Sequence, residues 1–213
     1  MTYIAYPFDD EGPVIGYLVY EGENTTPGGT ASGDPVTAHT AFMQRLNPGV
    51  AVEDFEGWAI GTQFLNVARS LNGLSLTITR TGYGAALNFY VNNGSTSGRF
   101  NTTPSGSNFL ETCGADLISP AVLSFSSPIA FFGCYFTDLG DFLGQLTIEL
   151  TKVDSSTVTI DINHTLGAPN GSLYFWGFVD DLDTYTQIRI ITDSNEDFFG
   201  IDDLCYGPAS LIA

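Results

Sequence analysis

The 213-residue chain has room for one β-rich domain, because sandwiches often run to ~200–250 residues as a single unit. Its composition, 43% hydrophobic and 13% aromatic with only 14% charged residues, favours strands over helices. Twenty-four acidic residues against six basic ones give a formal net charge of −18, which disfavours nucleic acids and anionic membranes as partners. Most of these carboxylates are explained by an acidic surface on which like charges keep the chains apart in solution. For the remaining carboxylates, divalent cations are the favoured ligands.

The N-terminal residues 1–35 are expected to form an arm and a linker outside the main domain, which then spans 36–213. The apolar stretch GPVIGYLVYE (12–21) suits a strand or an arm. The following GENTTPGGTASGDP (22–35) is rich in Gly, Thr and Pro, which is typical of a linker. Arms of this kind can be exchanged between copies of a chain, so a homo-oligomer is expected.

One helix is predicted, within DPVTAHTAFMQRLNPG (34–49). Asp34 is expected at the N-cap and Pro35 at the first helical position, and the Asn-Pro-Gly at 47–49 ends the helix. Three apolar residues recur at helical spacing: Ala38, Phe42 and Leu46. His39 is expected at the surface.

From residue 50 onward the pattern predicts strands. Apolar residues alternate with polar ones in four segments: 74–79, 87–91, 145–150 and 157–162. Segments 129–136 and 173–179 are apolar on both faces, and 184–192 and 198–206 complete the set. Turn residues separate these segments at the spacing of a sandwich. The expected fold is all-β: a two-sheet, jelly-roll-like antiparallel sandwich with one short N-terminal helix.

The cysteines and the absence of targeting signals indicate a reducing site of synthesis. The odd number of cysteines, Cys113, Cys134 and Cys205, argues against a complete disulfide framework, although one pair could form. Cys134 and Cys205 lie in apolar runs and are expected as buried free thiols. No basic residue precedes Arg45, so a secretory signal is not expected, and no apolar run reaches transmembrane length. Synthesis in a host cytoplasm, without a membrane partner, is expected.

Several stretches occur in an order that resembles a known domain. They are AFMQRL ahead of VEDFEGWAIGT (52–62), GRFNTTPSGSNFLE (98–111), LSFSSPIAFFGCYFTDLGDF (123–142), GQLTIEL, APNGSLYFWGFVDDLDTYTQIRI (168–190) and FFGIDDLCYG (198–207). Together they resemble the domain of bacterial exported proteins that carry a PEP-CTERM sorting tail. The resemblance spans about residues 36–207 and implies a β-sandwich, in a family mostly of undetermined function. Neither the signal peptide nor the sorting tail is recognised in this sequence, so surface sorting is not expected to carry over.

The acid of FEG (55–57) and the pair Asp202-Asp203 are also similar to those of other jelly rolls, including MAM domains and several carbohydrate-binding modules. In those, a first-strand acid and a last-strand acid share a structural calcium ion. The resemblance implies a calcium site at Glu56, Asp202 and Asp203, since calcium takes roughly six to eight oxygens and relieves carboxylate repulsion. Strand alternation sends Asp202 and Asp203 to opposite faces, so one is expected in the metal shell and the other at solvent or a loop cap. Without an ion, the same carboxylates would accept backbone N–H bonds or face water.

A second acidic pair, Asp138 and Asp141, lies in the turn TDLGDF (137–142). It suits a second cation site or the rim of a ligand groove, although turn chemistry alone explains it more simply.

The sequence lacks a recognisable catalytic constellation. No Glu-x-Asp-x-Glu run of the kind that jelly-roll glycosidases carry on one strand occurs, no Gly-x-Ser-x-Gly elbow occurs, and the two histidines, His39 and His164, lie far apart in the sequence. The chain is therefore not expected to be an enzyme.

Two non-enzymatic functions remain. The first is a structural bacteriophage virion component, a capsid-decoration (cement) or tail-associated protein that assembles with itself and with capsid or tail proteins. The second is a calcium-stabilised carbohydrate-binding or adhesin module at a cell surface or outside the cell, with Trp58 or Tyr83 stacking on a glycan. Trp176 is expected in the core instead. The virion function is favoured narrowly, because fold does not determine function.

Overall fold

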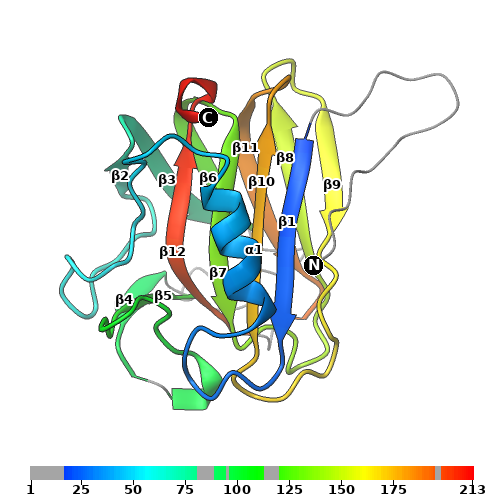
Figure 1. The fold of residues 1–213 in the computed structure, drawn as a ribbon. Helices are drawn as coiled ribbons and strands as arrows, with labels where there is room; N and C mark the ends of the chain where they lie inside the picture. Colours follow the sequence, from blue (N-terminus) through cyan, green and yellow to red (C-terminus); the bar gives the residue numbers. More distant parts are fainter. Residues whose placement is uncertain (1–16, 81–88, 95, 113–119, 195–197) are drawn as a thin grey trace, which may run out of the picture.

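Residues 17–80, 89–94, 96–112, 120–194 and 198–213 are described by the computed structural model. Two antiparallel six-stranded sheets face each other, and one α-helix lies on the outer face of the first sheet (Figure 1). The predicted two-sheet sandwich with one short helix is confirmed. Among the described residues, no helix has the length and hydropathy that a membrane span requires.

The first sheet runs in the order β1 (Tyr17–Asn24), β10 (Leu173–Asp180), β7 (Phe131–Thr137), β12 (Gly200–Gly207), β5 (Phe109–Glu111) and β4 (Tyr90–Asn92). The second runs β2 (Ala68–Leu71), β3 (Leu74–Arg80), β6 (Ala121–Ile129), β11 (Tyr185–Thr192), β8 (Leu146–Lys152) and β9 (Thr157–Asp161). Two short 3₁₀ turns lie at Thr96–Gly98 and Ala209–Leu211. The predicted apolar run 129–136 spans two strands, because the chain bends at Ala130 between β6 and β7.

Two hydrophobic clusters explain why the central strands of the first sheet are apolar on both faces. The larger lies between the sheets and includes Trp176, which is fully buried as predicted. The smaller lies between the same strands and helix α1 (Asp34–Met43). Every residue of β7 and β10 is therefore buried. Cys134 and Cys205 are buried free thiols, as expected, while Cys113 lies outside the described residues.

Helix α1 is held on the sheet by Phe42, which is 0% exposed. It lies over Gly133 of β7 and Gly177 of β10, which are paired across the two strands. A Cβ atom at Gly133 would lie 3.0 Å from the Phe42 ring, and one at Gly177 would lie 3.1 Å from it. Because the two glycines have no side chains, the Phe42 ring packs directly against the sheet. We call this contact the Phe42 seat, and it fixes the helix on the sheet.

The start of α1 differs from the prediction. The N-cap is Gly33, with a φ of 76°, and Asp34 lies in the first turn, because the glycine adopts the backbone geometry that the chain needs before Pro35. His39 is half-buried rather than at the surface, since its ring packs 5.1 Å from those of Tyr135 and Phe175.

Part of the predicted arm belongs to the sandwich. β1 pairs with β10 along its whole length, from Tyr17 opposite Asp180 to Asn24 opposite Leu173. The Asn24 amide also donates to the carbonyl and hydroxyl oxygens of Ser32, which folds the predicted linker back on itself. The correction has a simple cause: the apolar face of β1 is buried by the sheet and by α1. Residues 1–16 lie outside the described residues.

Candidate functional site

Two of the predicted acidic residues, Glu56 and Asp202, meet behind the loop 101–108. Glu56 follows a short pairing between Glu53 and Leu204, which places this segment beside β12. The Glu56 Oε1 atom accepts hydrogen bonds from the backbone N–H groups of Ser107 and Asn108, both at 2.7 Å. It also accepts one from the Asn101 amide at 3.0 Å. We call this arrangement of Glu56, Asp202 and the loop the carboxylate clasp.

Asp202 is the more deeply buried member of the clasp, at 0% exposure. Its Oδ2 atom accepts from the backbone N–H of Thr102 at 2.6 Å, from the Thr102 hydroxyl at 2.9 Å and from the Asn101 amide at 3.2 Å. Burial, helped by the neighbouring Asp203 charge, raises the Asp202 pKa to about 8, against the pull of these donors. The clasp therefore ties the last strand to a loop 100 residues earlier in the chain.

The prediction that Asp202 and Asp203 point to opposite faces is wrong. The pairing of β12 with β7 shifts between Asp202 and Cys205, and Asp203 has a φ of 48°, so a β-bulge breaks the alternation. As a result Asp203 also turns to the loop, where it accepts from the Thr103 hydroxyl at 2.7 Å.

A calcium ion, as the resemblance implies, would need more oxygens than the predicted three carboxylates offer at one point. In the described part of the chain, no three His, Cys, Asp or Glu side chains lie close enough together to hold an ion. The chemistry of the available oxygens nevertheless fits a hard cation. Glu56 Oε1, Asp202 Oδ2 and the Asn108 carbonyl all lie within 3.2 Å of one atom, the Asn101 Nδ2. The Asn101 nitrogen occupies that point, so an ion would bind there only if the Asn101 side chain moved away.

The second predicted acidic pair is divided between different partners. Asp138 is 1% exposed, accepts from the Gly171 N–H at 2.8 Å and lies 3.6 Å from Arg99. Burial raises its pKa to about 6, and the nearby Asp141 charge adds to the rise. Asp138 is therefore committed to the protein interior, while Asp141 is half-buried in the next turn.

Of the two predicted stacking residues, the structure describes Trp58, whose ring is covered by its neighbours. The Trp58 ring stands edge-on to Phe64 at 5.4 Å, and the Arg69 guanidinium covers it at 4.4 Å from the ring centre. Tyr83 lies outside the described residues.

On the outer side of the clasp loop is a cavity of about 470 Å³, which we call the neutral groove. All 13 lining residues are uncharged. They are Gly29, Thr30, Ala31, Asn93, Phe100, Asn101, Thr102, Thr103, Pro104, Ser105, Gly106, Ser107 and Phe109. None of these residues was predicted to bind a ligand, although the run NTTPSGSN (101–108) carries the signal: hydroxyls and amides without a charge.

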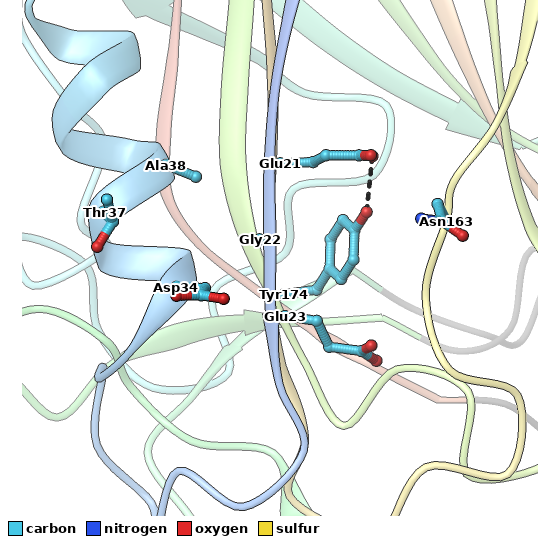
Figure 2. Close-up of a pocket in the computed structure, with 8 residues that line it drawn as sticks. All are labelled: Glu21, Gly22, Glu23, Asp34, Thr37, Ala38, Asn163 and Tyr174. Atoms are coloured by element: carbon cyan, nitrogen blue, oxygen red, sulfur yellow. Dashed lines mark hydrogen bonds between the residues drawn. The ribbon is translucent and has the colours of Figure 1, made fainter. Parts of the chain in front are cut away.

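A smaller cavity of about 210 Å³, the acidic pocket, lies between β1, the start of α1 and the segment after β9. Figure 2 shows Glu21 and Glu23 extending from the same side of β1, with the Tyr174 hydroxyl directed at Glu21. That hydroxyl donates to Glu21 at 2.8 Å, yet burial raises the Glu21 pKa. Glu23 accepts from the Thr165 N–H at 2.8 Å and from its hydroxyl at 2.7 Å. The Glu-x-Glu spacing on one strand was the missed signal.

Comparisons with known proteins find no matching family model and no matching curated protein, so the PEP-CTERM resemblance stays a prediction. Solved structures give distant similarities. The enzymatically active domain of tailspike protein 4 of bacteriophage CBA120 is 13% identical, with a TM-score of 0.41 over 76% of this chain and 21% of that one. This chain thus spans about a fifth of the tailspike chain's length.

Two other solved structures are similar at the same level. The C-terminal family 22 carbohydrate-binding module of Clostridium thermocellum Xyn10B is 13% identical, with a TM-score of 0.40 over 64% of this chain and 88% of that one. A Stig cyclase from Fischerella sp. TAU is also 13% identical, with a TM-score of 0.40 over 73% and 94%. Similarities this distant carry no argument about function.

Proposed function

We propose that the protein is a non-catalytic carbohydrate-binding module that binds an uncharged glycan in the neutral groove. One observation carries the proposal: all 13 groove-lining residues are uncharged in a chain with a formal net charge of −18. A surface this acidic repels anions and attracts cations, so a cavity without charge favours a neutral ligand.

The chemistry of the groove favours a polyhydroxylated ligand. Serine and threonine hydroxyls both donate and accept hydrogen bonds, and asparagine amides do the same through separate atoms. Sugar hydroxyls need both kinds of partner. At about 470 Å³ the groove has the size of a small-molecule site and would accommodate a short oligosaccharide.

The clasp prepares the groove for binding. Asn101, Thr102, Thr103 and Ser107 all line the groove, and all bond to a clasp carboxylate or to Asp203. A loop fixed in this way loses little conformational freedom when a ligand binds, which favours affinity. A structural calcium ion at the clasp would stiffen the same wall.

A glycan array of uncharged and uronic-acid oligosaccharides tests the proposal, followed by calorimetry on the best ligand. Thr30→Trp places a large side chain at the groove and should weaken binding at least tenfold. The matched control, Thr40→Trp, puts the same side chain on the exposed face of α1 and should leave affinity unchanged. Both positions are exposed, so folding is preserved. Binding of no uncharged glycan, or equal affinity in the wild type and Thr30→Trp, would overturn the proposal.

The virion role and the associated location stay predictions. Assembly through an exchanged arm needs residues 1–35 to hold a neighbouring chain, whereas residues 17–24 are paired with β10 of their own sheet. Light scattering on the full chain and on a chain that begins at residue 17 tests what remains of this hypothesis. An oligomer that dissociates on truncation would support assembly through residues 1–16.

A further inference from the structure

We propose that copies of this chain associate head to tail, with strand β2 of one copy pairing antiparallel with strand β9 of the next. The partner is therefore a second copy of the same chain, and the contact continues the second sheet from one molecule into the next. This inference does not depend on the proposed glycan binding.

The two sides of the sandwich differ in charge. The segment 57–110, which includes β2, β3 and β4, contains no Asp or Glu and three of the six basic residues. These are Arg69, Arg80 and Arg99, of which Arg99 is paired with Glu111. Strands β1, β8 and β9 lie at the opposite side of the molecule (Figure 1). On these strands and in the turn between β8 and β9 are Glu21, Glu23, Glu149, Asp154 and Asp161. The β2 side of one copy is therefore complementary in charge to the β9 side of another.

Strands β2 and β9 are the two edges of the second sheet. In the part of the chain that the structure describes, neither has a paired strand on its outer side. The neighbouring edge of the first sheet is covered, because Gln63 pairs with Tyr90 of β4. Proteins commonly protect an exposed edge with Pro, Lys or a β-bulge. β2 (ARSL) and β9 (TVTID) contain no Pro or Lys, and they pair with β3 and β8 without a register shift. Both edges are therefore open to another strand.

Strand direction and residue register both allow this pairing. All neighbouring strands of the six-stranded sheet are antiparallel, so β2 and β9, its first and last strands, run in opposite directions. A second copy in the same orientation thus presents its β2 antiparallel to β9. In the register that places Ala68 opposite Asp161, Leu71 lies opposite Val158. The first pair is exposed on the outer face, and the second belongs to the inner face, which packs against the core. Each side chain therefore stays on its own face of the sheet across the contact.

Charge favours this head-to-tail pairing over the two symmetric ones. Pairing β9 with β9 would bring the Asp154 and Asp161 carboxylates of two copies together, and pairing β2 with β2 would bring two Arg69 guanidinium groups together. Pairing β2 with β9 avoids both repulsions. Because the two surfaces differ, the contact does not close on itself, and association continues as an open chain of copies. The net charge of −18 opposes association at long range, so salt of about 0.15 M, which screens charges beyond about 8 Å, should promote it.

Sedimentation equilibrium of the full chain in about 0.15 M NaCl tests the inference without any glycan. The weight-average mass of the wild type should at least double as the protein concentration rises. Ala68→Glu places an acid on the β2 edge, where it faces the acidic side of the next copy, and should remain monomeric. The matched control, Thr40→Glu, adds the same charge on the exposed face of α1 and should associate as the wild type does. Both positions are exposed, so folding is preserved.

Asp161→Lys separates the proposed contact from general repulsion between acidic chains. This variant has a smaller net negative charge, so weaker repulsion alone would strengthen association. The inference predicts a monomer instead, because the new cation faces the Arg69 side of the next copy. An equal mixture of Ala68→Glu and Asp161→Lys should associate again, since the new acid of one variant meets the new cation of the other.

The inference is overturned if the wild type stays monomeric at every concentration, if either edge variant associates as Thr40→Glu does, or if the mixture stays monomeric. Glycan binding by a monomeric wild type would reject the inference and keep the proposed function. Association of the wild type without glycan binding would do the reverse.

Discussion

The acidic pocket and the neutral groove lie at two ends of one short stretch of chain, yet their chemistry is opposite. Gly29, Thr30 and Ala31 line the groove, and Asp34, Thr37 and Ala38 line the pocket. Carboxylates lie close to both cavities. Those of the pocket reach its lining, as Figure 2 shows for Glu21 and Glu23. Those of the clasp lie behind the groove wall.

The difference lies in how many donors each carboxylate meets. Asp202 Oδ2 accepts from the Asn101 amide and from the N–H and hydroxyl groups of Thr102, and it is fully buried. Glu21 has the Tyr174 hydroxyl as its partner in the pocket. Its several donors let the Asp202 carboxyl group be enclosed behind an uncharged surface, although burial still raises its pKa to about 8, whereas Glu21 stays at the cavity. Composition alone therefore says little about the charge of a given cavity.

The largest effect on stability should come from helix α1, because this helix and the segment before it line both cavities. Phe42→Ala removes the ring that seats α1 over Gly133 and Gly177, and the expected loss is about 3–5 kcal/mol of unfolding free energy. The segment before α1 and the start of α1 line both cavities. The loss of stability should therefore be accompanied by weaker glycan binding in the groove. Urea unfolding measures the loss.

Phe142→Ala is the matched control, since Phe142 is 52% exposed and removing it should cost less than about 0.5 kcal/mol. Equal losses for the two variants would show that α1 is not held by the Phe42 seat.

The fold could be predicted well because its signals are local. Alternation with period 2 marks strands such as 157–162, and a strand apolar on both faces, such as 173–179, predicts cover on both sides. The second cover is α1, whose apolar residues Ala38 and Phe42 were also readable. The sequence did not decide whether the segment of β1 is a strand or an arm, since its pairing with β10 depends on residues more than a hundred positions later.

The site could be predicted only in part because it depends on long-range partners. Glu56 and Asp202 were identified, but nothing local indicates that Asn101 joins them from 45 and 101 positions away. Asp203 was misplaced because its left-handed backbone follows from the bulge against β7, which no single strand encodes. Trp58 was expected as a platform, and only the tertiary structure places Arg69 over its ring.

An effect of intermediate size should come from lowering the pH, which protonates His164, the residue after Asn163 of the acidic pocket. His164 is 8% exposed, and its Nε2 accepts the backbone N–H of Leu146 at 3.1 Å, which requires the neutral ring. Burial lowers the His164 pKa, although Glu23, the Thr165 backbone and Asp193 oppose the shift. The unfolded chain therefore binds this proton more readily, so stability is lost as pH falls below about 6.5.

Stability should therefore fall measurably between pH 7 and pH 5, and His164→Gln should remove this loss. Because Asp138 and other groups titrate in the same range, the quantity to measure is the difference between wild type and variant across pH. A difference that stays constant from pH 7 to pH 5 would contradict this role of His164.

The smallest effect separates the two carboxylates of the acidic pocket. Glu21→Gln keeps an oxygen for the Tyr174 hydroxyl and removes a charge that burial disfavours, so stability at pH 7 should rise, by at most about 0.5 kcal/mol because solvent screens the site. Since the folded pKa is raised, the cost of ionising Glu21 appears as pH rises above about 4.5, and the gain should vanish near pH 4. Glu23→Gln should bring no such gain, because the charge that it removes is stabilised by two donors of Thr165; the glutamine oxygen can still accept the Thr165 N–H, and its N–H can donate to the Thr165 hydroxyl oxygen. If both variants gained equally, the number of donors around a carboxylate would not decide whether its charge is tolerated, and the contrast between pocket and groove would need another cause.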